Sequence, residues 1–171
     1  MEQSSEAQVV TLGIDREVFA VPVEAVHEIL DMRPVSRIPE APPYLAGLID
    51  VRGRGVPVID LRVKLGLGTT AATEHTRILV LEIPLGGRQL TLGLIADRVF
   101  EVMALDLRQI DAPPEIGVRW RSDYIAGVGR RGDGFVIIFD LARLFSGAEA
   151  AFISGNGLPG PSATRLELSP A

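Results

Sequence analysis

The sequence contains one glycine-rich hairpin pattern twice, and this repeat constrains the fold more than any other feature. The first copy spans residues 47–61, and the second spans residues 127–141 with no gap in the alignment. Each copy begins at a glycine, passes through a Gly-rich turn, continues with an apolar run and ends in Asp-Leu. Glycine reaches the positive φ of tight turns, and β-branched runs favour strands. Each copy therefore predicts two antiparallel strands and a short helix, with Asp60 or Asp140 as its N-cap.

Short apolar runs elsewhere predict further strands, over residues 8–14, 18–23, 76–83 and 89–95. We expect a helical turn followed by a strand over residues 23–30, and a short helix over 61–65. Residues 92–103 repeat the order of residues 19–30, since both contain an apolar strand, a small turn and a Val-x-Glu pattern.

Proline-rich stretches mark the connections. Residues 31–45 contain four prolines, which exclude a helix interior and a central strand, so we interpret them as a rigid surface loop. Residues 66–74 predict a loop between the two halves of the chain, and residues 104–124 a second long connection.

Composition limits the class of protein. The chain has 171 residues, 47% of them hydrophobic, which is enough for a packed interior. A formal net charge of −5 argues against a nucleic-acid binder, which would be basic. There is no cysteine, and the acidic, polar start is unlike a signal peptide, so we expect a cytoplasmic protein with no membrane insertion.

Many short strands, few helices and an internal duplication predict an all-β fold of two small barrels. Each half has about 60–70 residues, which is marginal for forming a hydrophobic core of its own, so we expect the halves to pack together and to exchange strands. The predicted unit is a single domain over 8–145, with lobes at about 8–68 and 76–145. Residues 1–7 and 154–171 are predicted to be flexible tails.

The sequence contains no combination of residues that is typical of a catalytic site. The two histidines, His27 and His75, have no ligand spacing, so no metal site is predicted. Asp60 and Asp140 are better explained as helix caps than as paired acids. No Rossmann or Walker glycine pattern is present, so we predict no cofactor and no enzyme activity.

Three residues allow a structural and a functional interpretation. Arg52 is either a surface arginine in a turn or a multi-donor group facing a partner. Val26 and Val99 occupy equivalent positions of the repeat, and are either core residues or an apolar floor for a partner helix.

Several motifs in unbroken order resemble the CheW family of chemotaxis coupling proteins. They are Arg37-Ile38-Pro39, the run from Pro42 to Arg62, Gly93 with Asp97 to Val102, Ile110 to Pro114, and Tyr124 to Val128. The resemblance covers residues 8–145. The family often has Asn two residues before the Arg-Gly, where this chain has Asp50, and no closing helix of the usual kind is evident after Phe145.

The resemblance implies two packed, SH3-like, five-stranded β-barrels and a non-catalytic adaptor. Such an adaptor couples the cytoplasmic tip of a chemoreceptor to the regulatory domain of a CheA-type histidine kinase at membrane receptor arrays. Carried over by motif position, it implies receptor binding by Val26, Glu28, Arg52 and Val99. It implies kinase binding by Val35, Ile38 and Gly47.

We expect no nucleic-acid partner and no requirement for a homo-oligomer. The alternative function is a β-barrel module that binds some other peptide outside chemotaxis.

Overall fold

The computed structural model describes residues 6–112 except Gly86, and residues 124–145. Its elements in chain order are β1 (Glu6–Ile14), β2 (Glu17–Pro22), η1 (Val23–Ala25), β3 (Val26–Asp31), β4 (Leu45–Val51), β5 (Arg54–Asp60), α1 (Leu61–Lys64), β6 (Arg77–Leu85), β7 (Arg88–Ala96), β8 (Arg98–Asp106), η2 (Leu107–Gln109), β9 (Ile125–Arg131), β10 (Gly134–Phe139) and α2 (Leu141–Leu144). The strands predicted from apolar runs, the helical turn before β3 and both short helices are confirmed.

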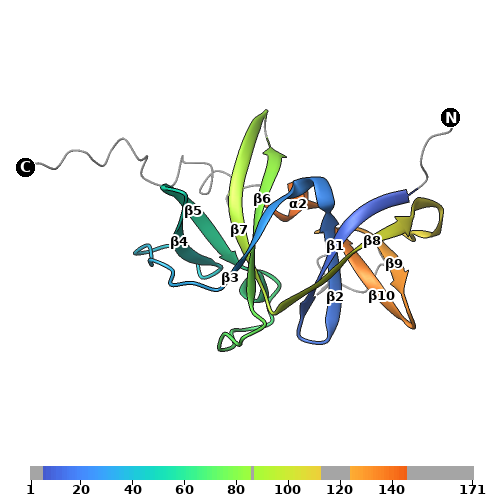
Figure 1. Cartoon of the computed structure of the whole chain (residues 1–171), viewed down its shortest axis with the longest axis horizontal. Coiled ribbons are helices and arrows are strands. Elements are labelled where there is room, and N and C mark those ends of the chain that lie inside the picture. The colour runs from blue at the N-terminus through green and yellow to red at the C-terminus, as the bar shows by residue number, and fades with distance from the viewer. Residues whose placement is uncertain (1–5, 86, 113–123, 146–171) are drawn as a thin grey trace, which may run out of the picture.

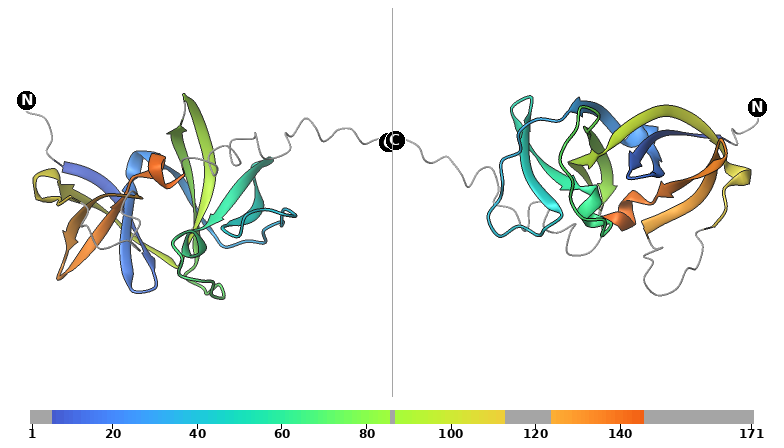
Figure 2. Two further views of the ribbon diagram at one scale, coloured as in Figure 1. Left: turned by 180° about the vertical axis from the view of Figure 1, so that it is seen from behind. Right: turned by 90° about the horizontal axis from the view of Figure 1, so that it is seen from below.

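The strands form two five-stranded sheets, each curled into a small barrel (Figure 1). Sheet 1 has the order β8-β1-β2-β10-β9 and makes lobe 1; sheet 2 has the order β3-β6-β7-β5-β4 and makes lobe 2. Figure 2 shows the lobes side by side from behind and from below. The predicted all-β fold of two packed, SH3-like barrels is confirmed.

The two halves of the chain exchange strands, so the lobes are not the consecutive segments 8–68 and 76–145. Lobe 1 combines β1 and β2 with three strands from the second half, and lobe 2 combines β6 and β7 with three strands from the first half. Four pairings make the exchange. The antiparallel pairs are β1 with β8 and β3 with β6, and the short parallel pairs are β2 with β10, where Phe19 lies opposite Ile137, and β5 with β7, where Val58 lies opposite Gly93. Neither sheet is complete without both halves.

One core cluster serves both lobes, because fully buried side chains from strands of both sheets pack into it, among them Leu12 of β1 and Leu94 of β7. A cation–π contact also spans the lobes. The Lys64 ammonium lies 4.6 Å from the ring centre of Tyr44, which precedes β4, and 5.5 Å from that of Tyr124, which precedes β9. The lobes are therefore held together by shared apolar packing and not only by the chain connections.

A polar cluster joins the lobes at the end of α1. The side chain of Arg62 is 12% exposed and donates hydrogen bonds to Asp15, in the β1–β2 turn, and to Asp97 (3.0 Å), between β7 and β8. Asp97 also accepts the backbone N–H of Asp15 at 2.8 Å. The hydrogen bond to Asp15 raises the pKa of Arg62, so the guanidinium stays charged. This one arginine ties lobe 2 to a turn of lobe 1 and to the strand crossover.

Two sequence predictions about the ends and connections differ from the structure. β1 begins at Glu6, so Glu6 and Ala7 of the predicted tail 1–7 belong to a strand; the rest of that tail and residues 154–171 lie outside the described residues. The connection predicted over 104–124 begins later, because β8 continues to Asp106. Residues 32–44 form no named element, in agreement with the predicted proline-rich loop.

Candidate partner-binding site

Three of the four predicted receptor residues lie on β3 and β8, two strands that are irregular at equivalent points. On β3, Val26 lies opposite Leu81 but Glu28 lies opposite Val80, so β3 has one extra residue there. On β8, a similar shift falls between Val99 and Val102. Such bulges re-aim the side chains beside them. The buried Thr11 hydroxyl fills the bulge of β8, donating to the carbonyl of Glu101 (2.9 Å) and accepting its N–H (3.1 Å).

Arg52 lies at the tip of the β4–β5 hairpin, in the first position of a two-residue turn. Its φ is +54° and that of Gly53 is +84°, the combination of a type I′ turn. A non-glycine residue in this region costs about 1–2 kcal/mol. The Asp50 carboxylate accepts the N–H of Gly53 at 2.8 Å and so supports the turn. The departure at Asp50 noted in the sequence therefore has a local structural role.

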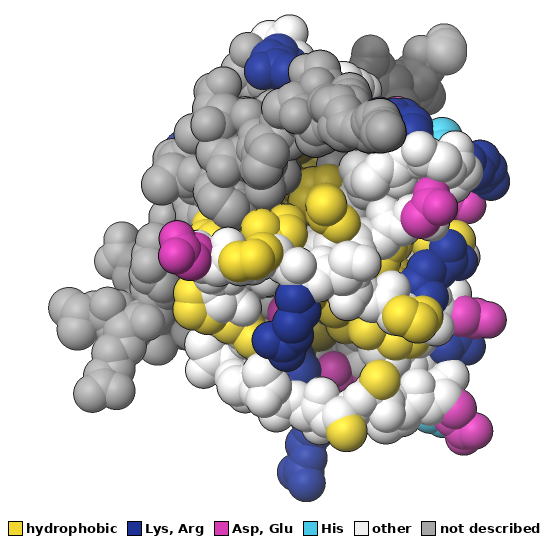
Figure 3. All heavy atoms as spheres, turned by 90° about the vertical axis from the view of Figure 1, so that its left-hand side faces the viewer, with side chains coloured by type: hydrophobic (Ala, Val, Ile, Leu, Met, Phe, Trp, Pro, Cys, Tyr) yellow, Lys and Arg dark blue, Asp and Glu magenta, His cyan; other side chains and the backbone are white. Residues whose placement is uncertain are grey.

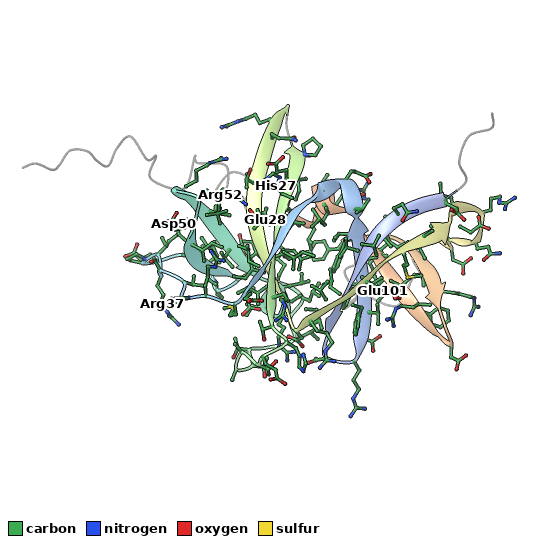
Figure 4. The ribbon with its side chains drawn as sticks, viewed as in Figure 1. His27, Glu28, Arg37, Asp50, Arg52 and Glu101 are labelled. Carbon is green, nitrogen blue, oxygen red and sulfur yellow. The ribbon has the colours of Figure 1, made fainter. Side chains whose placement is uncertain are left out.

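The Arg52 guanidinium contacts both carboxylate oxygens of Glu28, at 2.5 and 3.3 Å. The pair joins the two edge strands of sheet 2, β3 and the hairpin of β4. The Arg52 side chain is 71% exposed and that of Glu28 is 20% exposed. An exposed pair contributes at most about 1 kcal/mol to stability. Its main effect is to hold a charged, multi-donor group in one place at the surface (Figure 4).

Val26 and Val99 are half-buried, and both pack against the core cluster that the two sheets share. Val26 is the first residue of β3 and Val99 the second of β8, at the junction of the lobes. The structure thus brings Glu28 into contact with Arg52, and Val26 and Val99 pack against the same core cluster.

The three predicted kinase residues pack in different parts of lobe 2 and the shared core. Gly47 is buried, with a φ of +147°, and a Cβ added there would lie 2.1 Å from the Ser36 carbonyl oxygen and 2.8 Å from Val35 Cγ1. Gly47 thus supports the close approach of the loop that carries Val35. Ile38 packs against the shared core instead, whereas Val35 packs on a separate cluster within lobe 2. Figure 3 looks onto this side of the molecule and shows hydrophobic side chains between charged ones.

Lobe 1 holds a second acid–arginine pair that was not predicted from the sequence. Glu101 of β8 lies 3.4 Å from Arg131 of β9, and these are the two edge strands of sheet 1. Two exposed apolar residues at equivalent positions, Ile29 (43% exposed) and Val102 (58%), were also not predicted. The Val-x-Glu repeat in the sequence already places Glu101 at the position of Glu28, but it does not indicate the pairing with Arg131.

Within the described residues, no group of three or more His, Cys, Asp or Glu could hold a metal ion. None of the helices there has the length and apolar character needed to cross a membrane.

A family model described as the CheW-like domain matches residues 8–149, which include both predicted binding sets and both lobes. The chain belongs to the CheW-like domain family. Relatives called chemotaxis protein CheW share 32% identity in Klebsiella aerogenes (86% of each chain covered) and 30% in Treponema pallidum (83% of this chain and 84% of that one). The crystal structure of the scaffolding protein TtCheW from Thermoanaerobacter tengcongensis superposes with a TM-score of 0.73. It is 29% identical and covers 84% of this chain and 94% of its own. The CheW fold thus agrees with the sequence-based expectation.

Proposed function

We propose that this chain is a non-catalytic adaptor that couples chemoreceptors to a CheA-type histidine kinase in chemotaxis or a related chemosensory pathway. The observation that carries the proposal is the match to the CheW-like domain over residues 8–149, with relatives named chemotaxis proteins and a solved relative named a scaffolding protein. The chain would act in the cytoplasm, recruited to receptor arrays at the membrane, and the function needs no homo-oligomer.

Receptor binding is assigned to Val26, Glu28, Arg52 and Val99. The two valines supply apolar contact at the lobe junction, and Glu28 holds the Arg52 guanidinium outward. Interface anchors are commonly an arginine beside buried apolar groups, with charged residues at the rim. The cytoplasmic tip of a chemoreceptor is the proposed partner for this set.

Kinase binding is assigned to Val35, Ile38 and Gly47 of lobe 2. In support, Val35 lies in the loop that meets β4 at Gly47, where Ser36 and Leu48 exchange backbone hydrogen bonds of 2.8 Å. This bridge fixes the loop, so Val35 would be presented to a partner with little loss of entropy.

An adaptor of this kind needs no chemistry of its own. It holds receptor and kinase together, and a receptor state that binds it differently shifts the equilibrium of the kinase. The shared core and the Arg62 cluster make the two lobes one packed unit, so movement at one site has a physical route to the other.

The test is Arg52→Glu, with binding measured separately to a soluble receptor-tip fragment and to the kinase regulatory domain. We expect receptor binding to weaken at least about 10-fold, because charge reversal removes a charge-assisted contact and leaves a like charge beside Glu28. Kinase binding should not change. Arg16→Glu, at an exposed turn of lobe 1, is the control with the same charge change.

A second variant separates the two sites. Val35→Asp should weaken kinase binding and leave receptor binding unchanged. If the wild-type chain binds neither fragment, the adaptor proposal fails and a peptide-binding module outside chemotaxis becomes the better account.

A further inference from the structure

The two halves of the molecule carry an acid–arginine pair at equivalent places. Glu28 and Glu101 each follow a valine of the repeat by two residues, beside the irregular point of β3 or β8. Arg52 lies in the turn of the β4–β5 hairpin, and Arg131 is the last residue of β9, beside the turn of the equivalent β9–β10 hairpin. Each pair joins the edge strands of its sheet.

The exposure of the charges is reversed between the two pairs. In lobe 2 the arginine is outward: Arg52 is 71% exposed and Glu28 is 20%. In lobe 1 the acid is outward: Glu101 is 52% exposed and Arg131 is 30%. The Arg131 guanidinium is covered because it stacks on the Phe100 ring, 4.7 Å from its centre. One pair therefore presents a positive group to solvent, and the other presents a negative group.

Apolar side chains lie along the same two strands. Val26 and Val99 pack on the shared core at the lobe junction, and Ile29 and Val102 are exposed at equivalent positions further along β3 and β8. Figure 4 shows Glu28 and Arg52 over lobe 2, and Glu101 on β8 over lobe 1. The surface of β3 and β8 thus carries the outward Arg52 over lobe 2, apolar residues, and the outward Glu101 over lobe 1, with Asp31 of β3 and Arg98 of β8 also exposed.

We propose that Glu101 is a second specificity residue of the receptor-binding surface, and that Arg52 and Glu101 together fix the direction in which the receptor segment binds. The occupant is an amphipathic receptor segment with an acidic side chain at the Arg52 end and a lysine or arginine at the Glu101 end. The inference rests on the proposed receptor function. Its physical basis is charge complementarity: the reversed orientation would bring like charges together at both ends.

Binding of a receptor-tip fragment to single variants tests the role of Glu101. Glu101→Arg should weaken binding about 10-fold, the usual scale for reversing one charge-assisted contact. Glu17→Arg, at an exposed position of lobe 1 with the same charge change, should bind like the wild type. Arg131→Gln leaves the outward carboxylate in place and should retain binding.

The Arg131→Gln variant distinguishes direct recognition of the receptor by Glu101 from a purely structural role of the Glu101–Arg131 pair. If Glu101→Arg and Arg131→Gln weaken binding equally, or if Glu101→Arg behaves like Glu17→Arg, the proposal is wrong. Unfolding midpoints of all variants must stay near that of the wild type; a variant that does not fold is replaced by Glu101→Gln, for which about a 3- to 10-fold loss is expected.

Direction is measured by disulfide mapping, which the absence of native cysteines permits. Cysteines at Ile29 or Val102 are paired with single cysteines along the receptor segment. The wild type should give one ordered pattern, and Arg52→Glu combined with Glu101→Arg should invert it. An unchanged pattern in the double variant refutes the directional role. If the wild-type chain fails to bind the receptor fragment, both this inference and the proposed function fail; if only the Glu101 results fail, the proposed function stands.

Discussion

The two copies of the hairpin, residues 47–61 and 127–141, share their strand register and their cap, but of the first copy's side chains only Gly47, Val56, Asp60 and Leu61 recur in the second. The residue that follows each copy also differs. Both begin at a buried glycine, and both end in a capping aspartate whose N–H donates to the carbonyl of a tyrosine, Tyr44 (2.7 Å) or Tyr124 (2.8 Å). The turns differ in backbone as well as in sequence: Arg52 and Gly53 both have positive φ, whereas in the second turn only Gly132 does. Arg52 of the first copy aligns with Gly132, and Arg62, which follows that copy, aligns with Ala142.

Residues shared by the two copies form the lobes, and residues found in one copy alone make the lobes different. Features shared by both copies support the hairpin, its cap and its short helix. Arg54 is likewise unshared, since it aligns with Gly134. Two of the three unshared arginines act away from the hairpin backbone: Arg52 holds a charge at the surface, and Arg62 reaches into lobe 1. A substitution at a shared position should destabilise the lobe in which it is made, in either copy. A substitution at an unshared position should have an effect in the first copy that the aligned substitution in the second copy does not have.

The largest effect is expected at the opening glycines. Gly47→Ala introduces a Cβ 2.1 Å from a backbone oxygen at a φ of +147°, so it should cost about 3 kcal/mol or more. Gly127→Ala meets Ile110 Cγ2 at 2.5 Å, a side-chain atom that can move, and the Asp111 oxygen at 3.0 Å. It should cost about 1–2 kcal/mol, measured by urea unfolding.

Gly55→Ala is the matched control for the glycine pair. The added Cβ has only an ordinary contact, 3.9 Å from Leu48 Cδ1, and no positive φ is involved. Its free energy of unfolding should differ from the wild type by less than about 1 kcal/mol. Equal losses at Gly47 and Gly127 would contradict the distinction between backbone and side-chain obstruction.

Arg62→Ala should have the next largest effect, about 2 kcal/mol of lost stability, because it leaves two carboxylates facing each other. The value is below that for a fully buried pair, since Asp15 and Asp97 are 47% and 26% exposed. Ala142→Arg, the reverse change in the second copy, is at an exposed position and should alter stability by less than about 0.5 kcal/mol. A loss below that level for Arg62→Ala would mean that apolar packing alone holds the lobes.

Local features of this fold could be predicted from the sequence because they depend on neighbouring residues. The hairpins, the caps and the proline-rich loop follow from glycine, aspartate and proline at short spacing. The pairing of Glu28 with Arg52 was not predicted as a contact, although both residues were assigned to one site. The equivalent Glu101 was overlooked, because Arg131 aligns with Val51 and not with Arg52.

The sequence did not indicate which strands from distant parts of the chain pair with one another. The division into 8–68 and 76–145 follows the order of the repeat, but parallel pairing of β2 with β10 and of β5 with β7 joins strands from opposite halves. The pattern of apolar residues in a strand indicates which face of the strand is buried, but it does not indicate which other strand lies beside it. The bulge filled by Thr11 likewise depends on a contact between residues 90 apart in the chain.

The smallest effect concerns the two caps and depends on pH. Burial raises the pKa of Asp60 above its ordinary value of 3.8, so the folded state holds the proton more tightly than the unfolded chain. The stability from this group is complete below pH 3.8 and is lost as pH rises through the raised pKa. Asparagine caps a helix about as well as aspartate but does not titrate. Asp60→Asn should therefore gain stability relative to the wild type as pH rises through that window.

Two alanine variants separate capping from titration in this experiment. Asp60→Ala removes the cap that accepts the Arg62 N–H at 3.1 Å, and Asp140→Ala removes the one that accepts the Arg143 N–H at 3.2 Å. Each should lose about 1 kcal/mol at pH 7. Asp60→Ala should also follow the pH profile of Asp60→Asn, offset downward by about that amount, in thermal unfolding from pH 4 to pH 7. A constant difference between Asp60→Asn and the wild type over this range would show that burial of the Asp60 carboxylate has no energetic consequence, and that the two copies are capped alike.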